Sequence, residues 1–123
     1  MIQSMINYRQ GDVILVPFPF TDLSTIKQRP AVIISADLFN ADSLDIIAAA
    51  ITSNISSSSN ENEFMLSADD LHKGGLPKTS LVKLGKIVTI DKRLIRKNIG
   101  RLSKETMANI IRLVHRNILS NPS

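Results

Sequence analysis

Arg29 and Thr52 are the residues of this sequence best suited to chemistry on a phosphate. Arg29 precedes Pro30, which biases its backbone toward an extended conformation and favours a position at the mouth of a strand. A guanidinium pairs bidentately with phosphate oxygens and stays charged, so Arg29 suits anion binding better than proton abstraction. Thr52 ends the apolar stretch 44–52, where its hydroxyl can hydrogen-bond the same oxygens. Taken singly, each of these residue types is more often structural than catalytic.

Lys83 and Lys86 add positive charge to the long apolar stretch 79–90. Strict strand alternation places the two lysines on opposite faces of a sheet. A β-bulge at Gly85, which lies between them, would bring both to one face. Because an ordinary lysine is charged at neutral pH, we expect the pair to bind phosphates rather than to transfer protons.

The apolar pattern predicts a mainly β fold that ends in a helix. The stretch 12–18 is apolar on both alternating faces, as in a strand buried on both sides. Ser103 is expected to cap a closing helix, 104–119, whose apolar residues fall on one stripe down to Ile118. The other expected elements are strands at 31–34, 44–52, 63–67, 79–90 and 98–102, a helical turn at 37–42 and a short helix at 68–73. Together they predict a small curved sheet or barrel with the helix packed across it.

The composition limits the chemistry that the chain can support. Its 123 residues suffice for one domain around one core. The absence of cysteine excludes disulfides, thiolate nucleophiles and the usual structural zinc sites. We interpret His72 and His115 as structural, so no metal site and no cofactor is expected. No segment has the pattern of a signal peptide or a membrane span, which predicts a soluble, cytoplasmic protein without membrane association.

The net charge of +4 hides an asymmetry along the chain. Every charged side chain between Ala31 and Leu71 is acidic. After His72 the sequence has twelve basic residues and only two acidic ones, Asp91 and Glu105. A basic half of this kind can concentrate a polyanion such as RNA. It can equally be a solvated basic face, and the charge pattern alone leaves both interpretations open.

Three runs of the sequence together resemble the MazF/PemK family of bacterial toxins, which cut RNA in toxin–antitoxin pairs. The runs are GDVILVPFPFTDL…KQRPAVIIS, IIAAAITSNI and SLVKLGKIVTIDKRLI, and the resemblance covers about four fifths of the chain. It implies one domain over residues 1–123 with an SH3-like small β-barrel of the MazF/PemK/CcdB type, usually a homodimer. It further implies a metal-independent, sequence-specific endoribonuclease that cleaves single-stranded RNA by 2′-hydroxyl attack through a 2′,3′-cyclic phosphate. Its partner would be a cognate antitoxin protein.

The resemblance also assigns roles to individual residues. The arginine of the family's RP block and the threonine of its AAIT block form the catalytic pair, and here they match Arg29 and Thr52. The residues expected to contact RNA are Thr21, Asp22, Lys27, Ser53, Lys83 and Lys86.

The third run departs from the family pattern, which places an arginine, an acid or a glutamine just before the TID tripeptide. Here the corresponding stretch, 79–90, presents Gly85 and Lys86 instead. The sequence therefore does not assign the residue that would transfer protons. Two other functions therefore stay possible for the same fold. One is a non-catalytic toxin that binds a protein, as the related CcdB-type gyrase inhibitors do, and the other is a plain RNA-binding module.

Overall fold

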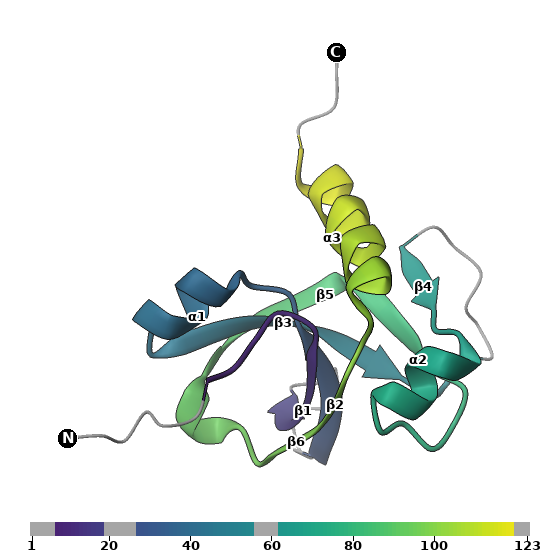
Figure 1. Ribbon diagram of the computed structural model, residues 1–123, viewed down its shortest axis with the longest axis horizontal. Coiled ribbons are helices and arrows are strands. Elements are labelled where there is room, and N and C mark those ends of the chain that lie inside the picture. The colour runs from purple at the N-terminus through teal and green to yellow at the C-terminus, as the bar shows by residue number, and fades with distance from the viewer. Residues whose placement is uncertain (1–6, 19–26, 56–61, 120–123) are drawn as a thin grey trace.

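The computed structural model describes residues 7–18, 27–55 and 62–119 (Figure 1). Most expected elements are present within a residue or two of their predicted bounds. The main difference is the second strand, which begins at Lys27 and not at Ala31. The elements are β1 (Asp12–Phe18), β2 (Lys27–Ile33), α1 (Asp37–Asp42), β3 (Asp45–Thr52), β4 (Glu63–Met65), α2 (Ala68–Lys73), β5 (Leu81–Asp91), a 3-10 turn η1 (Lys92–Leu94), β6 (Lys97–Arg101) and α3 (Lys104–Ile118).

The described strands form one antiparallel sheet in the order β4-β5-β3-β2-β1-β6. Figure 1 shows the sheet curling on itself, with α3 packed across β5 and with α1 and α2 at opposite ends of the molecule. The predicted mainly β fold with a C-terminal helix is thus confirmed. The curl stops short of a closed barrel, because within the described residues no ladder joins the edge strands β4 and β6.

Both faces of the central strands are buried, as the β-branched residues on alternating faces of β1 predicted. Val13 and Val32 point to one face, where they pack with Met107, Ile110 and Val114 of α3. Their strand neighbours point the other way, into the hollow of the curled sheet, and form a second cluster that includes Ile14, Val16, Ala31, Ile33, Ile46 and Ala48. All of these β1 and β2 residues are fully buried. β1 and β2 are therefore covered on both faces by the core.

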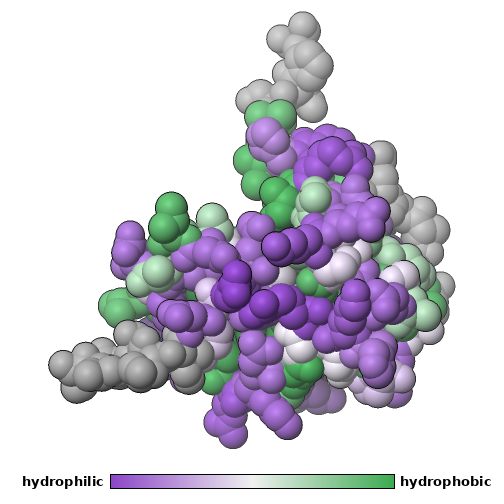
Figure 2. Space-filling model, in the orientation of Figure 1, coloured by the Kyte–Doolittle hydropathy of each residue, from purple (hydrophilic) through white to green (hydrophobic). Residues whose placement is uncertain are grey.

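The closing helix α3 begins as predicted, with the Ser103 hydroxyl accepting a hydrogen bond from the backbone N–H of Thr106. The buried part of its apolar stripe ends at Val114, and Ile118 is 71% exposed. The helix runs past the edge of the sheet (Figure 1), and Figure 2 shows hydrophobic surface at its far end. Among the described residues, no helix combines the length and apolarity needed to cross a membrane.

A buried carboxylate ties α2 to the start of α3. Asp70 is 3% exposed and accepts hydrogen bonds from the Ser103 backbone N–H at 3.0 Å, the Ser67 hydroxyl at 3.3 Å and the Thr106 hydroxyl. Burial opposes the charge, but these hydrogen bonds together outweigh it and lower the pKa of Asp70. Asp70 thereby fixes the two helices relative to each other.

The predicted bulge in β5 is confirmed. Ala49 of β3 pairs with Ile87, yet Ile51, two residues further on, pairs with Val82. The intervening β5 residues, from Lys83 to Lys86, therefore bow out of the ladder. A Cβ placed on Gly85 would meet no atom within 4 Å, so the bulge leaves this position open to solvent.

Candidate active site

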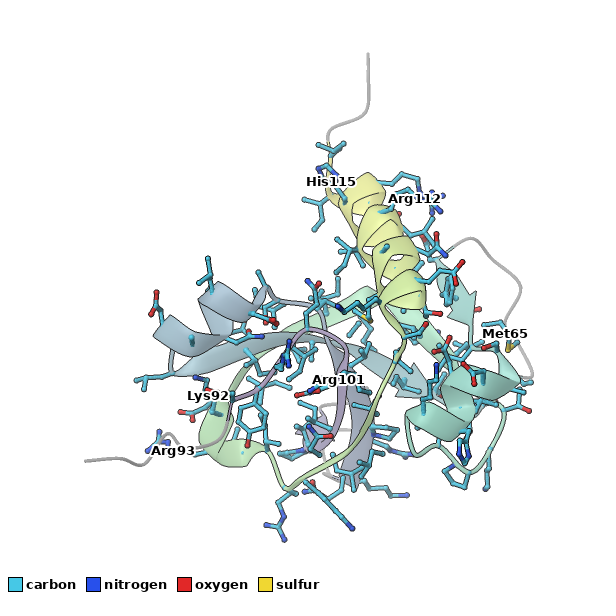
Figure 3. All side chains as sticks on the ribbon, in the orientation of Figure 1. Met65, Lys92, Arg93, Arg101, Arg112 and His115 are labelled. Carbon is cyan, nitrogen blue, oxygen red and sulfur yellow. The ribbon has the colours of Figure 1, made fainter. Side chains whose placement is uncertain are left out.

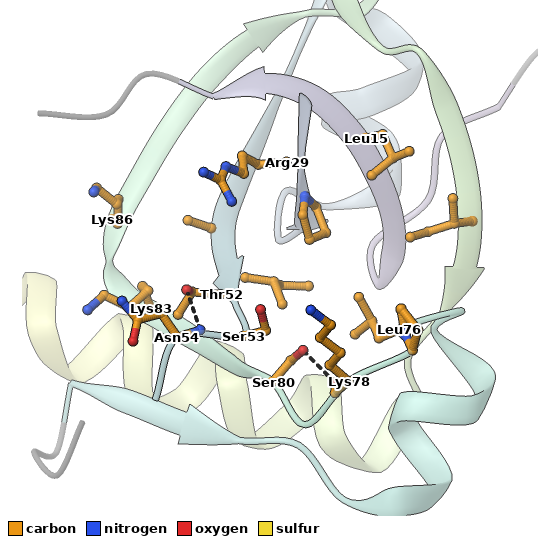
Figure 4. A pocket seen from close by; sticks show the side chains of 15 residues that line it. Leu15, Arg29, Thr52, Ser53, Asn54, Leu76, Lys78, Ser80, Lys83 and Lys86 are labelled. Carbon is orange, nitrogen blue, oxygen red and sulfur yellow. Dashed lines mark hydrogen bonds between the residues drawn. The ribbon is translucent and has the colours of Figure 1, made fainter. Parts of the chain in front are cut away.

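A pocket of about 610 Å³ opens where β2, β3, β5 and the loop between α2 and β5 meet (Figure 4). Part of its lining is apolar, from residues such as Leu15, Ala50 and Ile51, and the rest is polar and basic. The polar residues in the lining are Arg29, Thr52, Ser53, Asn54, Lys78, Ser80, Lys83 and Lys86.

The pocket brings together Arg29 and Thr52. Arg29 lies inside β2, opposite Val16 of β1, whereas a position at the mouth of the strand was expected; the strand already begins at Lys27. Thr52 is the last residue of β3. The β2–β3 ladder ends at the pair Ala31 and Ala50, so Arg29 and Thr52 each lie two residues beyond the end of that ladder on neighbouring strands. Both side chains line the pocket, with Arg29 exposed and Thr52 half-buried.

The Thr52 hydroxyl has a defined orientation. Its oxygen accepts a hydrogen bond of 3.0 Å from the backbone N–H of Asn54, where β3 gives way to the following loop. This contact occupies an acceptor position of the oxygen and leaves the hydroxyl hydrogen available to another group. Thr52 is thereby prepared to donate a hydrogen bond to a ligand in the pocket.

The β5 bulge places Lys83 and Lys86 on the same pocket, as the sequence predicted. The Lys83 ammonium forms an ion pair of 2.8 Å with Glu63, its cross-strand partner on β4, whose side chain is only 10% exposed. Lys83 is thus held by a carboxylate that has little contact with solvent. Lys86 lies further up the same wall in Figure 4.

The other residues expected to contact RNA fall in different places. Ser53 lines the pocket at the end of β3. Lys27 is exposed at the start of β2 and does not belong to the pocket lining. Thr21 and Asp22 lie outside the described residues, as does most of the serine-rich loop after Ile55.

Sequence reasoning missed Lys78, which lines the pocket from the loop between α2 and β5. Figure 4 shows Lys78 across the pocket from Lys83 and Lys86. A lysine between a Gly-Gly turn and a strand was the available signal, but nothing in the sequence indicates that this loop faces β2 and β3. Only the tertiary fold brings Lys78 near Arg29.

The described residues that line the pocket include no aspartate, glutamate or histidine. His72 and His115 are exposed elsewhere, and no cluster of metal-ligating side chains occurs among the described residues. Asp91, whose pKa is lowered to about 2 by hydrogen bonds from Arg93, also lies outside the lining. The pocket is therefore suited to hold an anion.

The basic residues of the C-terminal half are spread over the molecule. Figure 3 shows Lys92 and Arg93 at one end and Arg112 with His115 at the other, on α3. Positively charged side chains nevertheless gather at the pocket, where Arg29 from the N-terminal half joins lysines from the C-terminal half. The cationic site is thus assembled by the fold rather than by one basic segment.

Sequence comparison identifies the family. A model of the PemK-like, MazF-like toxins of type II toxin–antitoxin systems matches residues 9–118. The chain belongs to this family. The resemblance seen in the three sequence runs is thereby confirmed. No curated protein sequence matches the chain.

Solved structures of endoribonucleases and of a MazE–MazF pair share the fold at low identity. An endoribonuclease from a mycobacterial species is 20% identical, with a TM-score of 0.71, covering 97% of this chain and 99% of its own. A mycobacterial endoribonuclease in complex with its cognate antitoxin is 22% identical, with a TM-score of 0.71 and coverage of 93% and 98%. MazE–MazF from Deinococcus radiodurans is 18% identical, with a TM-score of 0.71 and coverage of 92% and 97%. The match over nearly the whole of each chain shows that they share one fold.

Proposed function

We propose that this MazF-like toxin is a metal-independent endoribonuclease that cuts single-stranded RNA at specific sequences. The observation that carries the proposal is that Arg29 and Thr52, from neighbouring strands, line one cationic pocket. A pocket rimmed by arginine and lysines attracts phosphates and repels metal cations. The solved relatives named as endoribonucleases support the same activity.

The proposed reaction is a transesterification followed by release of the product. The 2′-oxygen attacks the adjacent phosphorus and loses its proton, while the bond from phosphorus to the 5′-oxygen breaks and that oxygen gains a proton. The products are a 2′,3′-cyclic phosphate and a 5′-hydroxyl. Negative charge grows on the non-bridging oxygens, where the Arg29 guanidinium and the Thr52 hydroxyl would stabilise it.

The partners follow from the same site. Two of the related structures are complexes with an antitoxin, one of them MazE with MazF. A cognate antitoxin of this chain would cover the basic pocket with an acidic or apolar segment and so exclude RNA. We also expect the protein to be a homodimer and to act in the cytoplasm.

The test is incubation of the purified protein with a long single-stranded RNA in EDTA, followed by mapping of the fragment ends. We expect site-specific cuts with 5′-hydroxyl ends. Arg29→Ala and Thr52→Ala should each abolish most of the cleavage while folding normally. Arg112→Ala, which removes an exposed arginine of α3 outside the pocket, should cleave like the wild type. Undiminished cleavage by Arg29→Ala would contradict the assignment.

A non-catalytic, CcdB-like toxin is the second candidate. It is favoured by the lack of a carboxylate or an imidazole among the described residues that line the pocket, since either would be an ordinary proton acceptor. Well-folded wild-type protein that leaves RNA intact but binds gyrase would establish this function. Salt-sensitive RNA binding without cleavage or gyrase binding would instead leave a plain RNA-binding module.

A further inference from the structure

We propose that Lys78 binds a second RNA phosphate, on the opposite side of the cleavage site from Lys83 and Lys86. This inference rests on the proposed ribonuclease function and adds a substrate contact to it. In this arrangement the scissile phosphate lies at Arg29 and Thr52. The two lysines of β5 lie on one side of it and Lys78 on the other (Figure 4).

The first support is the position of Lys78 relative to the reacting centre. Figure 4 shows the Lys78 side chain directed into the pocket from the α2–β5 loop, whereas Lys83 and Lys86 stand on the β5 wall across from it. A strand of RNA whose scissile phosphate lies at Arg29 has a further phosphate on each side. One neighbour would meet the β5 lysines, and the other would meet Lys78.

The second support is the rigidity of the segment that carries Lys78. Gly75 adopts a left-handed conformation with φ of +69°, and a Cβ there would lie 2.1 Å from the Ile99 carbonyl oxygen. Leu76 follows with its side chain buried and with its N–H bonded to the Leu71 carbonyl at 2.9 Å. The segment is therefore anchored at its start.

The end of the segment is anchored as well. Ser80 is 4% exposed, and its hydroxyl donates a hydrogen bond of 2.8 Å to the carbonyl oxygen of Lys78 itself. The Ser80 carbonyl in turn accepts the Leu66 N–H at 3.1 Å. Because the backbone of Lys78 is fixed before any ligand arrives, binding a phosphate requires ordering of the lysine side chain alone.

The third support is charge. The Lys83 ammonium is already paired with the Glu63 carboxylate, so part of its charge is neutralised. Lys78 is not among the ion-paired side chains of the described residues. Its positive charge is therefore the more available of the two for a phosphate.

The experiment measures binding of an RNA that the enzyme cannot cut. A short single-stranded RNA carries the mapped cleavage sequence, with a 2′-deoxyribose at the cut so that the attacking hydroxyl is missing. Dissociation constants are measured between 0.05 and 0.5 M salt for the wild type, Lys78→Ala, Lys78→Arg and Lys73→Ala. Lys73 is the matched control, because it lies on α2 outside the pocket lining and pairs with Asp69 at 3.0 Å.

Loss of one phosphate contact on single-stranded RNA makes the slope of log K against log salt shallower by about 0.7. At 0.1 M salt this corresponds to about fivefold weaker binding. We expect this change for Lys78→Ala, near-complete recovery in Lys78→Arg, and no change in Lys73→Ala. A methylphosphonate at each flanking position then locates the contact. At one of the flanking positions, the neutral methylphosphonate should weaken binding of the RNA by the wild type but not by Lys78→Ala.

The possible failures are distinguishable. If the wild type binds and cuts RNA but Lys78→Ala binds as Lys73→Ala does, the Lys78 contact is wrong and the ribonuclease function stands. If the methylphosphonate effects are the same in Lys78→Ala and the wild type, the contact is likewise wrong. If well-folded wild-type protein neither binds nor cuts RNA, the proposed function fails and the contact fails with it.

Discussion

Replacing Asp70 by alanine should destabilise the fold far more than replacing its neighbour Asp69. The Asp70 carboxylate is 3% exposed and accepts hydrogen bonds from the Ser103 N–H, the Ser67 hydroxyl and the Thr106 hydroxyl. A hydrogen bond to a charged group contributes about 1.5–3 kcal/mol, and each donor left without a partner costs about 1–3 kcal/mol. Relief of the carboxylate's desolvation offsets part of this loss.

The net cost for Asp70→Ala should be about 2–4 kcal/mol of the free energy of unfolding, within the range for breaking a buried polar network. Asp69 is exposed and pairs only with Lys73 on the helix surface among the described residues, so Asp69→Ala should cost at most about 0.5 kcal/mol. Urea denaturation of the two variants measures the difference directly.

A difference below about 1 kcal/mol between the two variants would refute the reasoning, because a network of this kind costs more than that to break. It would mean that water or a rearranged Ser67 satisfies the donors around α3. Asp70→Asn adds a check on charge. It keeps the shape of the side chain but replaces one acceptor oxygen with a donor, so its cost should fall between those of the two alanine variants.

Three further outcomes follow from the structure. Because the folded pKa of Asp70 lies below its ordinary value of 3.8, the stability that Asp70 contributes is present above pH 3.8 and is lost as the pH falls through the folded pKa. The difference in the free energy of unfolding between the wild type and Asp70→Asn, measured by urea denaturation, should therefore become smaller as the pH falls through that range. Gly85→Ala should stabilise the protein by about 0.4–1 kcal/mol, whereas Gly75→Ala, with its positive φ and a Cβ against the Ile99 carbonyl, should destabilise it by more than that, as thermal melts would measure. Glu63→Gln should bind RNA about threefold more tightly at low salt, since removing one charge ~7 Å from a phosphate in water changes the free energy by about 0.6 kcal/mol; weaker binding in a salt titration would show that Glu63 mainly holds Lys83 in place.

The local patterns of the sequence determined much of this protein. The β-branched residues of β1 indicated a strand buried on both faces, and Ser103 marked the start of α3, because strand alternation and helix capping depend on near neighbours. Gly85 between two lysines predicted the bulge that brings both to one pocket. Arg29 and Thr52 could be selected from their sequence runs, although their catalytic roles remain predictions.

The tertiary structure alone decided how these residues meet. The pairing of β2 with β3 brings Arg29 and Thr52 into the lining of one pocket, across a segment of the chain that no local pattern specifies. The α2–β5 loop carries Lys78 to the far wall of the same pocket, and the β4–β5 pairing gives Lys83 its partner Glu63. Each of these contacts joins residues distant in sequence, so it depends on register and sheet curvature. Sequence patterns report the preferences of neighbours, and the pocket is made by strands that meet only after folding.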